Sequence, residues 1–407
     1  MNAPRVDRFP LLLLSALFAL LSSFSARAER NPFEEEEADD FVPPPYLELA
    51  QQALDAGDVE AAVRVLKAAK VCWAERFEKC GFTQVDFNSL AGVVYLEQGF
   101  ARESAAALAS VVSAQPNRVP AWFYLGQAYF RLSKYEKAAD ALLQAEPVGR
   151  TLPQYHTLLV RAFMGAKQPE KARSALSAGL STFPEDASLL LEATRLFVAQ
   201  GFLKTATDFA EQYAAFATDT KALAFLVTAE AYRANGLLRD AIQVLEQAVL
   251  SSGEAEAMEH LAYAYTEASR PLSAARLFEK LLQTNPSLAL AASEQYRLAG
   301  HYREALSAAA RIPEIDRRKQ QLAVVYLQME SFDTAVEILL PIFRNGGLHD
   351  RRRLLLAFAA LHAGRLDLSG EVLDTIQDPN LKDSVAQLQN ALARSDRGDH
   401  STSHSDQ

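Results

Sequence analysis

Small and aromatic residues return at a nearly fixed spacing, about 34 residues, along most of this chain. Gly92 and Leu108, for example, recur one interval later as Gly126 and Leu142. Ala and Leu, which favour helices, are abundant throughout. No run of residues alternates apolar and polar positions as a half-buried strand does. The pattern therefore predicts an all-α chain built from repeated helical units.

Ten copies of the pattern align when Gly126 is taken as position 8 of its copy. The copies then begin near residues 43, 85, 119, 153, 187, 222, 255, 286, 316 and 350. Position 20 is small in every copy and reads Ala62, Ser104, Ala138, Ala172, Ala206, Ala241, Ala274, Ala305, Ala335 and Ser369. Position 15 reads Gly57, Gly99, Ser133, Lys167, Gly201, Gly236, Ser269, Gly300, Glu330 and Gly364. We expect two helices per copy, which approach closely at the small positions 8 and 20, with a left-handed glycine at position 15 ending the first.

The clearest copy, with Trp122, Leu125-Gly126, Tyr129, Ala138 and then Ala145, resembles the tetratricopeptide repeat. The resemblance covers roughly residues 43–383 and implies a right-handed α-solenoid of about ten helix-turn-helix repeats, which we assign to residues 43–394. An insertion near 70–84 lengthens the first copy. The late copies are about one turn shorter, and we expect the loss in the first helix or in the loop between copies. A generic array of helical hairpins, of the half-a-TPR or Sel1-like kind, is the alternative.

Residues 1–28 have the features of a secretory signal. Arg5 and Arg8 precede an apolar run over Leu11–Leu21, and Ala26–Ala28 offers a cleavage site with small residues. We expect cleavage near Ala28 and a periplasmic or secreted mature chain without an integral membrane span. An uncleaved membrane anchor is the alternative.

The regions flanking the repeats differ from them in composition. Residues 29–42 are acidic and rich in proline, which predicts a disordered linker, and residues 395–407 are polar, which predicts a disordered tail. The whole chain has a formal net charge of −10. This charge, together with export, disfavours nucleic-acid binding.

Cys72 and Cys80 are the only cysteines in the sequence, and both fall in the insertion. A close pair in an oxidising compartment is a disulfide candidate. Eight residues of continuous helix span about 12 Å, which is too far for a disulfide, since its Cα atoms lie roughly 4.4–6.8 Å apart. Either the helix breaks between the cysteines, which we favour, or they remain unpaired.

We find no phosphate-binding glycine loop, no nucleophile elbow and no His/Cys/Asp/Glu cluster with metal-ligand spacing. The seven histidines are scattered along the chain. The sequence therefore predicts no enzymatic activity, no cofactor and no metal site.

In the tetratricopeptide family, positions 2, 5, 9, 12 and 13 of the first helix line the concave surface. Carried over to this chain, they give a candidate peptide groove made of Phe123, Gln127, Phe130, Arg131, Arg161, Met164, Arg195 and Arg233. Such a basic, partly apolar groove within an acidic protein would suit an acidic peptide. The alternative is that the arginines pair with glutamates of neighbouring copies. No copy has the position-9 asparagine of the carboxylate-clamp subclass, so chaperone C-termini are not the expected ligand.

A second basic patch consists of Arg317, Arg318, Lys319, Arg351, Arg352 and Arg353. These two triplets occupy matching places in the last two copies. We expect Asp316 and Asp350 to cap the helices that begin there. The patch is either a contact for an anionic partner or a solvated edge.

The resemblance implies a non-catalytic scaffold for protein–protein interaction, here in the cell envelope. Its expected partners are envelope proteins or acidic peptide segments of a multiprotein machine for outer-membrane assembly, export, secretion or motility, with possible peripheral association with a membrane complex. The alternative function is a repeat module that binds glycan or cell-wall polymer.

Overall fold

The computed structural model describes residues 44–76 and 79–402, which contain helices and no strand. The predicted signal (1–28), the predicted linker (29–42) and the last residues of the predicted tail (403–407) lie outside the described residues. Within the described ranges, no helix has both the length and the apolar character needed to cross a bilayer. The described chain forms two compact units, which meet in sequence at Phe216 and Ala217.

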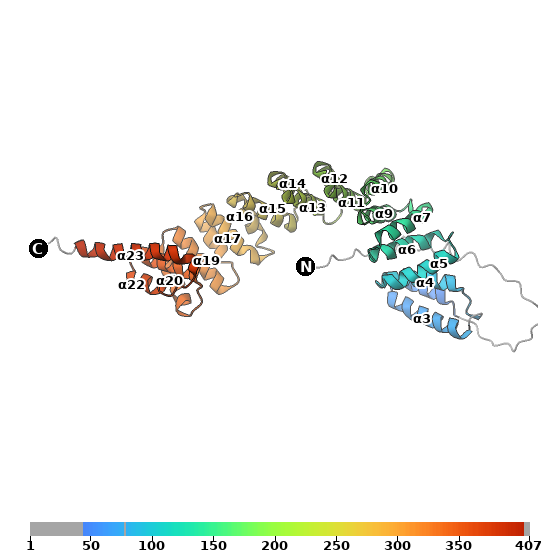
Figure 1. The fold of residues 1–407 in the computed structure, drawn as a ribbon, viewed down its shortest axis with the longest axis horizontal. Coiled ribbons are helices and arrows are strands. Elements are labelled where there is room, and N and C mark those ends of the chain that lie inside the picture. The colour runs from blue at the N-terminus through green and yellow to red at the C-terminus, as the bar shows by residue number, and fades with distance from the viewer. Residues whose placement is uncertain (1–43, 77–78, 403–407) are drawn as a thin grey trace, which may run out of the picture. The chain divides into compact units, whose positions relative to one another are not determined.

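The first unit is a row of helical hairpins (Figure 1). Its helices are α2 (Tyr46–Asp55), α3 (Val59–Arg76), α4 (Gln84–Glu97), α5 (Ala101–Ala114), α6 (Val119–Arg131), α7 (Tyr135–Gln144), α8 (Glu146–Gly149), α9 (Pro153–Gly165), α10 (Pro169–Thr182), α11 (Ala187–Ala199) and α12 (Leu203–Phe216). We call the first helix of each hairpin its A helix and the second its B helix. The A helices α2, α4, α6, α9 and α11 each contact the next A helix along the row.

The second unit repeats this arrangement. Its helices are α13 (Leu223–Ala234), α14 (Leu238–Ser252), α15 (Ala255–Glu267), α16 (Pro271–Leu281), η3 (Pro286–Leu288), α17 (Ala289–Leu298), α18 (Tyr302–Ala309), α19 (Ile315–Gln328), α20 (Phe332–Arg344), α21 (Asp350–His362), α22 (Leu366–Leu373), η4 (Pro379–Leu381) and α23 (Lys382–Thr402). The last helix continues through residues 395–402, which the sequence assigned to a disordered tail. Ala391, Leu392 and Arg394 favour helix and allow α23 to extend into this segment.

Position 20 is fully buried in every hairpin. All ten residues at this position are 0 % exposed, which confirms the predicted register. Position 8 lies on the A helix, where it faces position 20 of the B helix. A Cβ added to Gly126 would sit 2.7 Å from Cγ of Leu142 and 3.3 Å from the carbonyl oxygen of Ala138. The helices of this hairpin are therefore close enough to require small residues on both sides.

Position 15 has a left-handed backbone in all ten hairpins, with φ between 56° and 83°. The sequence predicted this conformation from glycine, yet four of the ten residues are Ser133, Lys167, Ser269 and Glu330. The turn from A helix to B helix thus imposes the conformation whatever the side chain. A left-handed residue other than glycine costs about 1–2 kcal/mol.

These turns provide a matched pair of stability predictions. No atom lies within 4 Å of a Cβ added at Gly201, where φ is +78°. We therefore expect Gly201→Ala to lower the free energy of unfolding by about 1 kcal/mol through backbone strain alone. Lys167→Gly should raise it by about 0.5 kcal/mol, because relief of strain is partly offset by greater unfolded-state entropy.

Urea unfolding followed by tryptophan fluorescence measures both effects, since the two tryptophans of the chain, Trp73 and Trp122, belong to the first unit. Equal unfolding midpoints for the parent chain and both variants would contradict the assignment of strain to position 15.

The late hairpins are short because their B helices are short. α16 has 11 residues and α18 has 8, whereas α10 and α14 have 14 and 15. The expectation that the A helix or the loop between copies had lost a turn was wrong. Pro286 and Pro313 come four to five residues after α16 and α18 and limit how far either helix could extend.

The early insertion lengthens α3 and is closed by a disulfide between Cys72 and Cys80, whose Cα atoms are 6.0 Å apart. α3 ends at Arg76, so the cysteines do not share one continuous helix. Next to the disulfide, the ring of Phe82 stacks on that of Trp73 at a centroid distance of 5.6 Å. Both cysteine side chains are buried, which makes the disulfide part of the packing at this end of the first unit.

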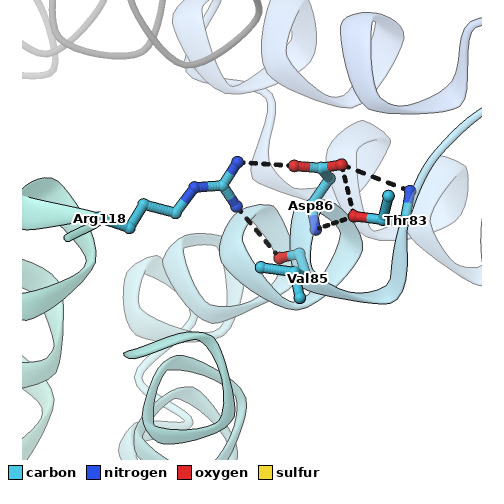
Figure 2. Close-up of polar contacts among 4 residues, drawn as sticks. All are labelled: Thr83, Val85, Asp86 and Arg118. Atoms are coloured by element: carbon cyan, nitrogen blue, oxygen red, sulfur yellow. Dashed lines mark hydrogen bonds and ion pairs between the residues drawn. The ribbon is translucent and has the colours of Figure 1, made fainter. Parts of the chain in front are cut away.

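The start of α4 is fixed by a small polar network (Figure 2). Thr83 and Asp86 form a reciprocal capping box. Arg118, from the connection before α6, donates to Oδ1 of Asp86 at 2.6 Å and to the carbonyl of Val85 at 3.4 Å. Burial raises the pKa of Asp86, but hydrogen bonds from Thr83 and Arg118 outweigh burial and leave that pKa below its ordinary value.

Because the folded pKa of Asp86 is lowered, the ionised network stabilises the fold above the ordinary pKa of 3.8 and stops doing so as pH falls through the lowered value. Arg118→Met should therefore lower the free energy of unfolding by about 1 kcal/mol at neutral pH. The difference from the parent should shrink on acidification. Urea titrations from neutral pH to about pH 2 test this, and a difference that is constant with pH would refute the role of Asp86.

Candidate functional site

Three neighbouring A helices of the first unit, α6, α9 and α11, carry most of the predicted groove residues. We call their exposed side the first-unit A-helix face. Together the three helices contain Arg131, Arg161 and Arg195 but only one acidic residue, Glu192. This face is therefore positively charged within a chain whose net charge is −10.

Glu192 is the centre of a two-arginine cluster. Its Oε1 accepts a hydrogen bond from Nε of Arg161 at 2.7 Å, across hairpins, and one from Nη1 of Arg195 at 2.8 Å, within α11. The carboxylate is 2 % exposed, whereas the side chains of Arg161 and Arg195 are 27 % and 37 % exposed. One buried negative charge thus holds two guanidinium groups at the surface, with an excess of one positive charge.

Sequence reasoning missed Glu192 because it occupies position 6, which is not a groove position in the family. A signal was available. Glu192 is the sole charged residue in the otherwise apolar run Leu189–Ala193, and a buried charge needs a partner of opposite sign.

Arg131 also has a structural contact. Its Nη1 donates to the carbonyl oxygen of Leu96, close to the end of α4. The last carbonyls of a helix carry partial negative charge, so a guanidinium there stabilises the helix end. Arg131 nevertheless remains exposed to solvent.

The apolar candidates differ in accessibility. Phe123 is only 7 % exposed and packs in the core beside Tyr124, so it lines no groove. The sequence placed it at the surface because the register does not show how deeply position 5 is covered. Phe130 is half-buried, and its ring meets that of Tyr135 in an edge-on arrangement with the centroids 5.5 Å apart. Gln127 and Met164 are half-buried as well.

Arg233 belongs to the second unit and is surrounded by acids. Its guanidinium forms ion pairs with the carboxylates of Glu230 within α13, at an N–O distance of 2.9 Å, and of Glu267 in the next A helix, at 3.1 Å. The alternative interpretation, that the arginines pair with glutamates of neighbouring copies, is confirmed for Arg161 and Arg233. Arg161 and Arg233 differ in the acids around them, because Arg233 pairs with two glutamates and the helix that supplies Glu267, α15, contains further acidic residues.

Only some residues of the second basic patch form side-chain hydrogen bonds with the backbone. Arg318 donates to the carbonyls of Ile312 and Pro313, and Arg353 donates to those of Leu348 and Thr375. These two residues fasten the connections that precede α19 and α21.

The other four patch residues have exposed or half-buried side chains. Arg352 is half-buried. Burial lowers the pKa of its guanidinium, and the negative charge of Glu294, which raises that pKa, offsets only part of the effect. Arg317, Lys319 and Arg351 are exposed and show no side-chain bond to another described residue.

The predicted aspartate caps are not formed. α19 begins at Ile315 with Glu314 as its N-cap residue, so Asp316 already lies inside the helix. α21 begins at Asp350 itself, whose carboxylate accepts hydrogen bonds from the backbone N–H groups of Gln377 and Asp378. The helices start earlier than the charge pattern indicated, so Asp316 lies two residues and Asp350 one residue past the N-cap position.

The tetratricopeptide repeat family model matches residues 90–154 and 226–289. A tetratricopeptide repeat protein from Parabacteroides merdae is 16% identical, with a TM-score of 0.43 over 63% of this chain and 97% of its own. MamA from Desulfovibrio magneticus RS-1 is 20% identical, with a TM-score of 0.37 over 42% and 92% of the two chains. PilW, a type IV pilus biogenesis factor, is 16% identical, with a TM-score of 0.38 over 51% and 96%. Comparison with curated proteins finds no match.

The family match falls on one stretch in each compact unit, and the hairpin geometry continues beyond both stretches. Position 20 is fully buried and position 15 is left-handed in every hairpin, including those outside the matched residues. The chain therefore contains tetratricopeptide repeats in both units, and its remaining hairpins share their geometry.

Proposed function

We propose that this protein is a non-catalytic scaffold of the cell envelope, and that acidic segments of partner proteins bind its first-unit A-helix face. The tetratricopeptide fold implies protein–protein interaction, and proteins of this fold are generally non-catalytic. The observation that carries the proposal is the excess positive charge at the Arg161–Glu192–Arg195 cluster, on helices with no other acidic residue.

The chemistry of this face fits a peptide that combines carboxylates with apolar side chains. Arg161 bonds Glu192 through Nε and Arg195 does so through Nη1, so further N–H groups of each guanidinium have no partner among the described residues. A guanidinium pairs strongly with carboxylates when several of its N–H groups are used. Phe130 and Met164, both half-buried, border the arginines and supply apolar contact area.

Two features support an envelope location. Residues 1–28 have the composition of a secretory signal, and a disulfide such as Cys72–Cys80 is stable in an oxidising compartment. A role in assembling a machine for outer-membrane assembly, export, secretion or motility follows from this location and from the scaffold fold.

Selection of random peptides displayed on phage against the full chain tests the binding proposal. We expect the recovered peptides to be enriched in Asp and Glu next to apolar residues. Their affinity should fall at high salt, because the contacts are electrostatic and partly exposed. Peptides without acidic enrichment would count against the proposal.

A pair of charge variants locates the binding face. Gln127→Glu with Ala199→Glu adds two negative charges to the first-unit A-helix face, and it should weaken binding of the selected peptides about tenfold or more. The matched control, Gln212→Glu with Ala215→Glu, adds the same charges at exposed positions of the B helix α12. Equal loss in both variants would show that net charge, and not this face, governs binding.

A further inference from the structure

Exposed cations border two successive connections in the second unit. The connection from α18 to α19 contains Arg311 and is followed by Arg317 and Lys319. The connection from α20 to α21 has Arg344 before it and Arg351 after it. We call these five residues the basic edge. All five side chains are exposed, and none has a hydrogen bond or ion pair with another residue in the part of the chain that the structure describes.

The two connections lie on the same edge of the unit. α19 and α20 form a hairpin, α20 packs against α21, and α19 also contacts α21 directly. Because the chain reverses direction twice between them, α19 and α21 run the same way and begin at the same side. Arg318 and Arg353 then hold the two connections in place through backbone carbonyls.

Few acids offset this charge. Glu314 and Asp316 are exposed nearby, while Asp350 is occupied by the backbone N–H groups of Gln377 and Asp378 and by Arg353. The basic edge therefore has a net positive charge, although the chain as a whole is acidic.

The charge is concentrated at these two connections. The preceding connection, residues 282–288, follows one exposed cation, Lys280, and the following one contains Asp374 and Asp378 ahead of Lys382. A cluster of this kind, local and opposite in sign to the rest of the protein, is a surface on which one particular anionic partner gathers.

An apolar side chain stands in the middle of the cations. Ile315, the first residue of α19, is 63 % exposed, with Arg311, Arg317 and Lys319 close to it in sequence. Basic residues around an exposed apolar side chain match the two layers of a bilayer surface, because the cations meet anionic headgroups while the apolar group enters the acyl boundary. An acidic protein surface would satisfy the cations but not Ile315.

We propose that the basic edge docks this protein onto an anionic phospholipid surface. The docking surface is separate from the first-unit A-helix face and goes beyond the proposed peptide binding, so either can fail without the other. Five cations and one exposed isoleucine give weak, reversible and salt-sensitive attachment. Such attachment would bring the scaffold to a membrane through residues that the proposed peptide binding does not use.

The test is co-sedimentation of the full chain with vesicles of phosphatidylcholine, with and without phosphatidylglycerol. We expect binding to depend on phosphatidylglycerol and to be lost at about 0.5 M salt. The variant Arg317→Gln, Lys319→Gln, Arg351→Gln should bind anionic vesicles about 100-fold more weakly, from the loss of three surface cations. Ile315→Ser should weaken binding without changing its salt dependence.

The control variant Lys67→Gln, Lys70→Gln, Arg102→Gln removes the same charge from exposed positions of the first unit and should bind like the parent. Any contribution of residues 1–28 is common to all these proteins and cancels in the comparison. Equal binding to neutral vesicles, or equal loss in control and edge variants, would overturn the proposal. So would binding of soluble polyglutamate through the edge without vesicle binding, which would assign the edge to an acidic protein.

Discussion

Replacing Arg161 and Arg195 together with methionine is expected to lower the free energy of unfolding of the first unit by about 3–5 kcal/mol. Both arginines bond the same oxygen of Glu192, which is 2 % exposed. Without them the carboxylate stays buried with no partner of opposite charge, and its desolvation is uncompensated. Methionine keeps most of the packing volume, so the loss reports mainly on the charge.

Urea unfolding followed by tryptophan fluorescence measures the effect in the unit that contains the cluster. Adding Glu192→Leu to the double variant should restore most of the lost stability, because the buried charge is then gone. An unchanged unfolding midpoint in the double variant would mean that Glu192 is solvated in solution. For the same reason, charge reversal at Arg161 and Arg195 is a poor test of binding, since it would damage the fold of the face itself.

The second large effect is expected from Ala138→Leu, at about 3 kcal/mol of destabilisation. Ala138 is 0 % exposed, and its carbonyl oxygen would lie 3.3 Å from a Cβ placed on Gly126 of the facing helix. Three extra carbon atoms therefore have no space unless α6 and α7 move apart. Separation of the hairpin would also disturb its contacts with the neighbouring hairpins.

Trp122 lies in α6, so tryptophan fluorescence follows unfolding of this hairpin directly. Asp140→Leu is the matched control, because it introduces the same side chain at an exposed position of α7 and should leave stability within about 0.5 kcal/mol of the parent. If Ala138→Leu unfolded at the same urea concentration as Asp140→Leu, the repeat register would be wrong.

The repeat register could be predicted from sequence because it depends on short-range sterics that recur ten times. A small residue at position 20 and a turn at position 15 are needed within each hairpin, whatever its neighbours are. The sequence therefore located both positions even in the last hairpin, where Ser369 replaces alanine and is still fully buried. It also located the disulfide candidate, since the insertion allowed α3 to end between Cys72 and Cys80.

The candidate site was predicted less well because it depends on contacts between hairpins. Glu192 meets Arg161 from 31 residues away, and Arg233 meets Glu267 from 34 residues away. The charge of an arginine on the A-helix face is neutralised or left in excess according to which acidic residues the next hairpin places beside it. The family positions name the residues on the face but contain no information about these partners.

Hydrogen–deuterium exchange of the full chain, with and without an acidic peptide obtained by selection, shows which helices the peptide contacts. We expect slower exchange on peptide binding in α6, α9 and α11, with little change in the B helices α7, α10 and α12. Protection confined to those B helices or to the second unit would contradict the claim that partner segments bind the first-unit A-helix face.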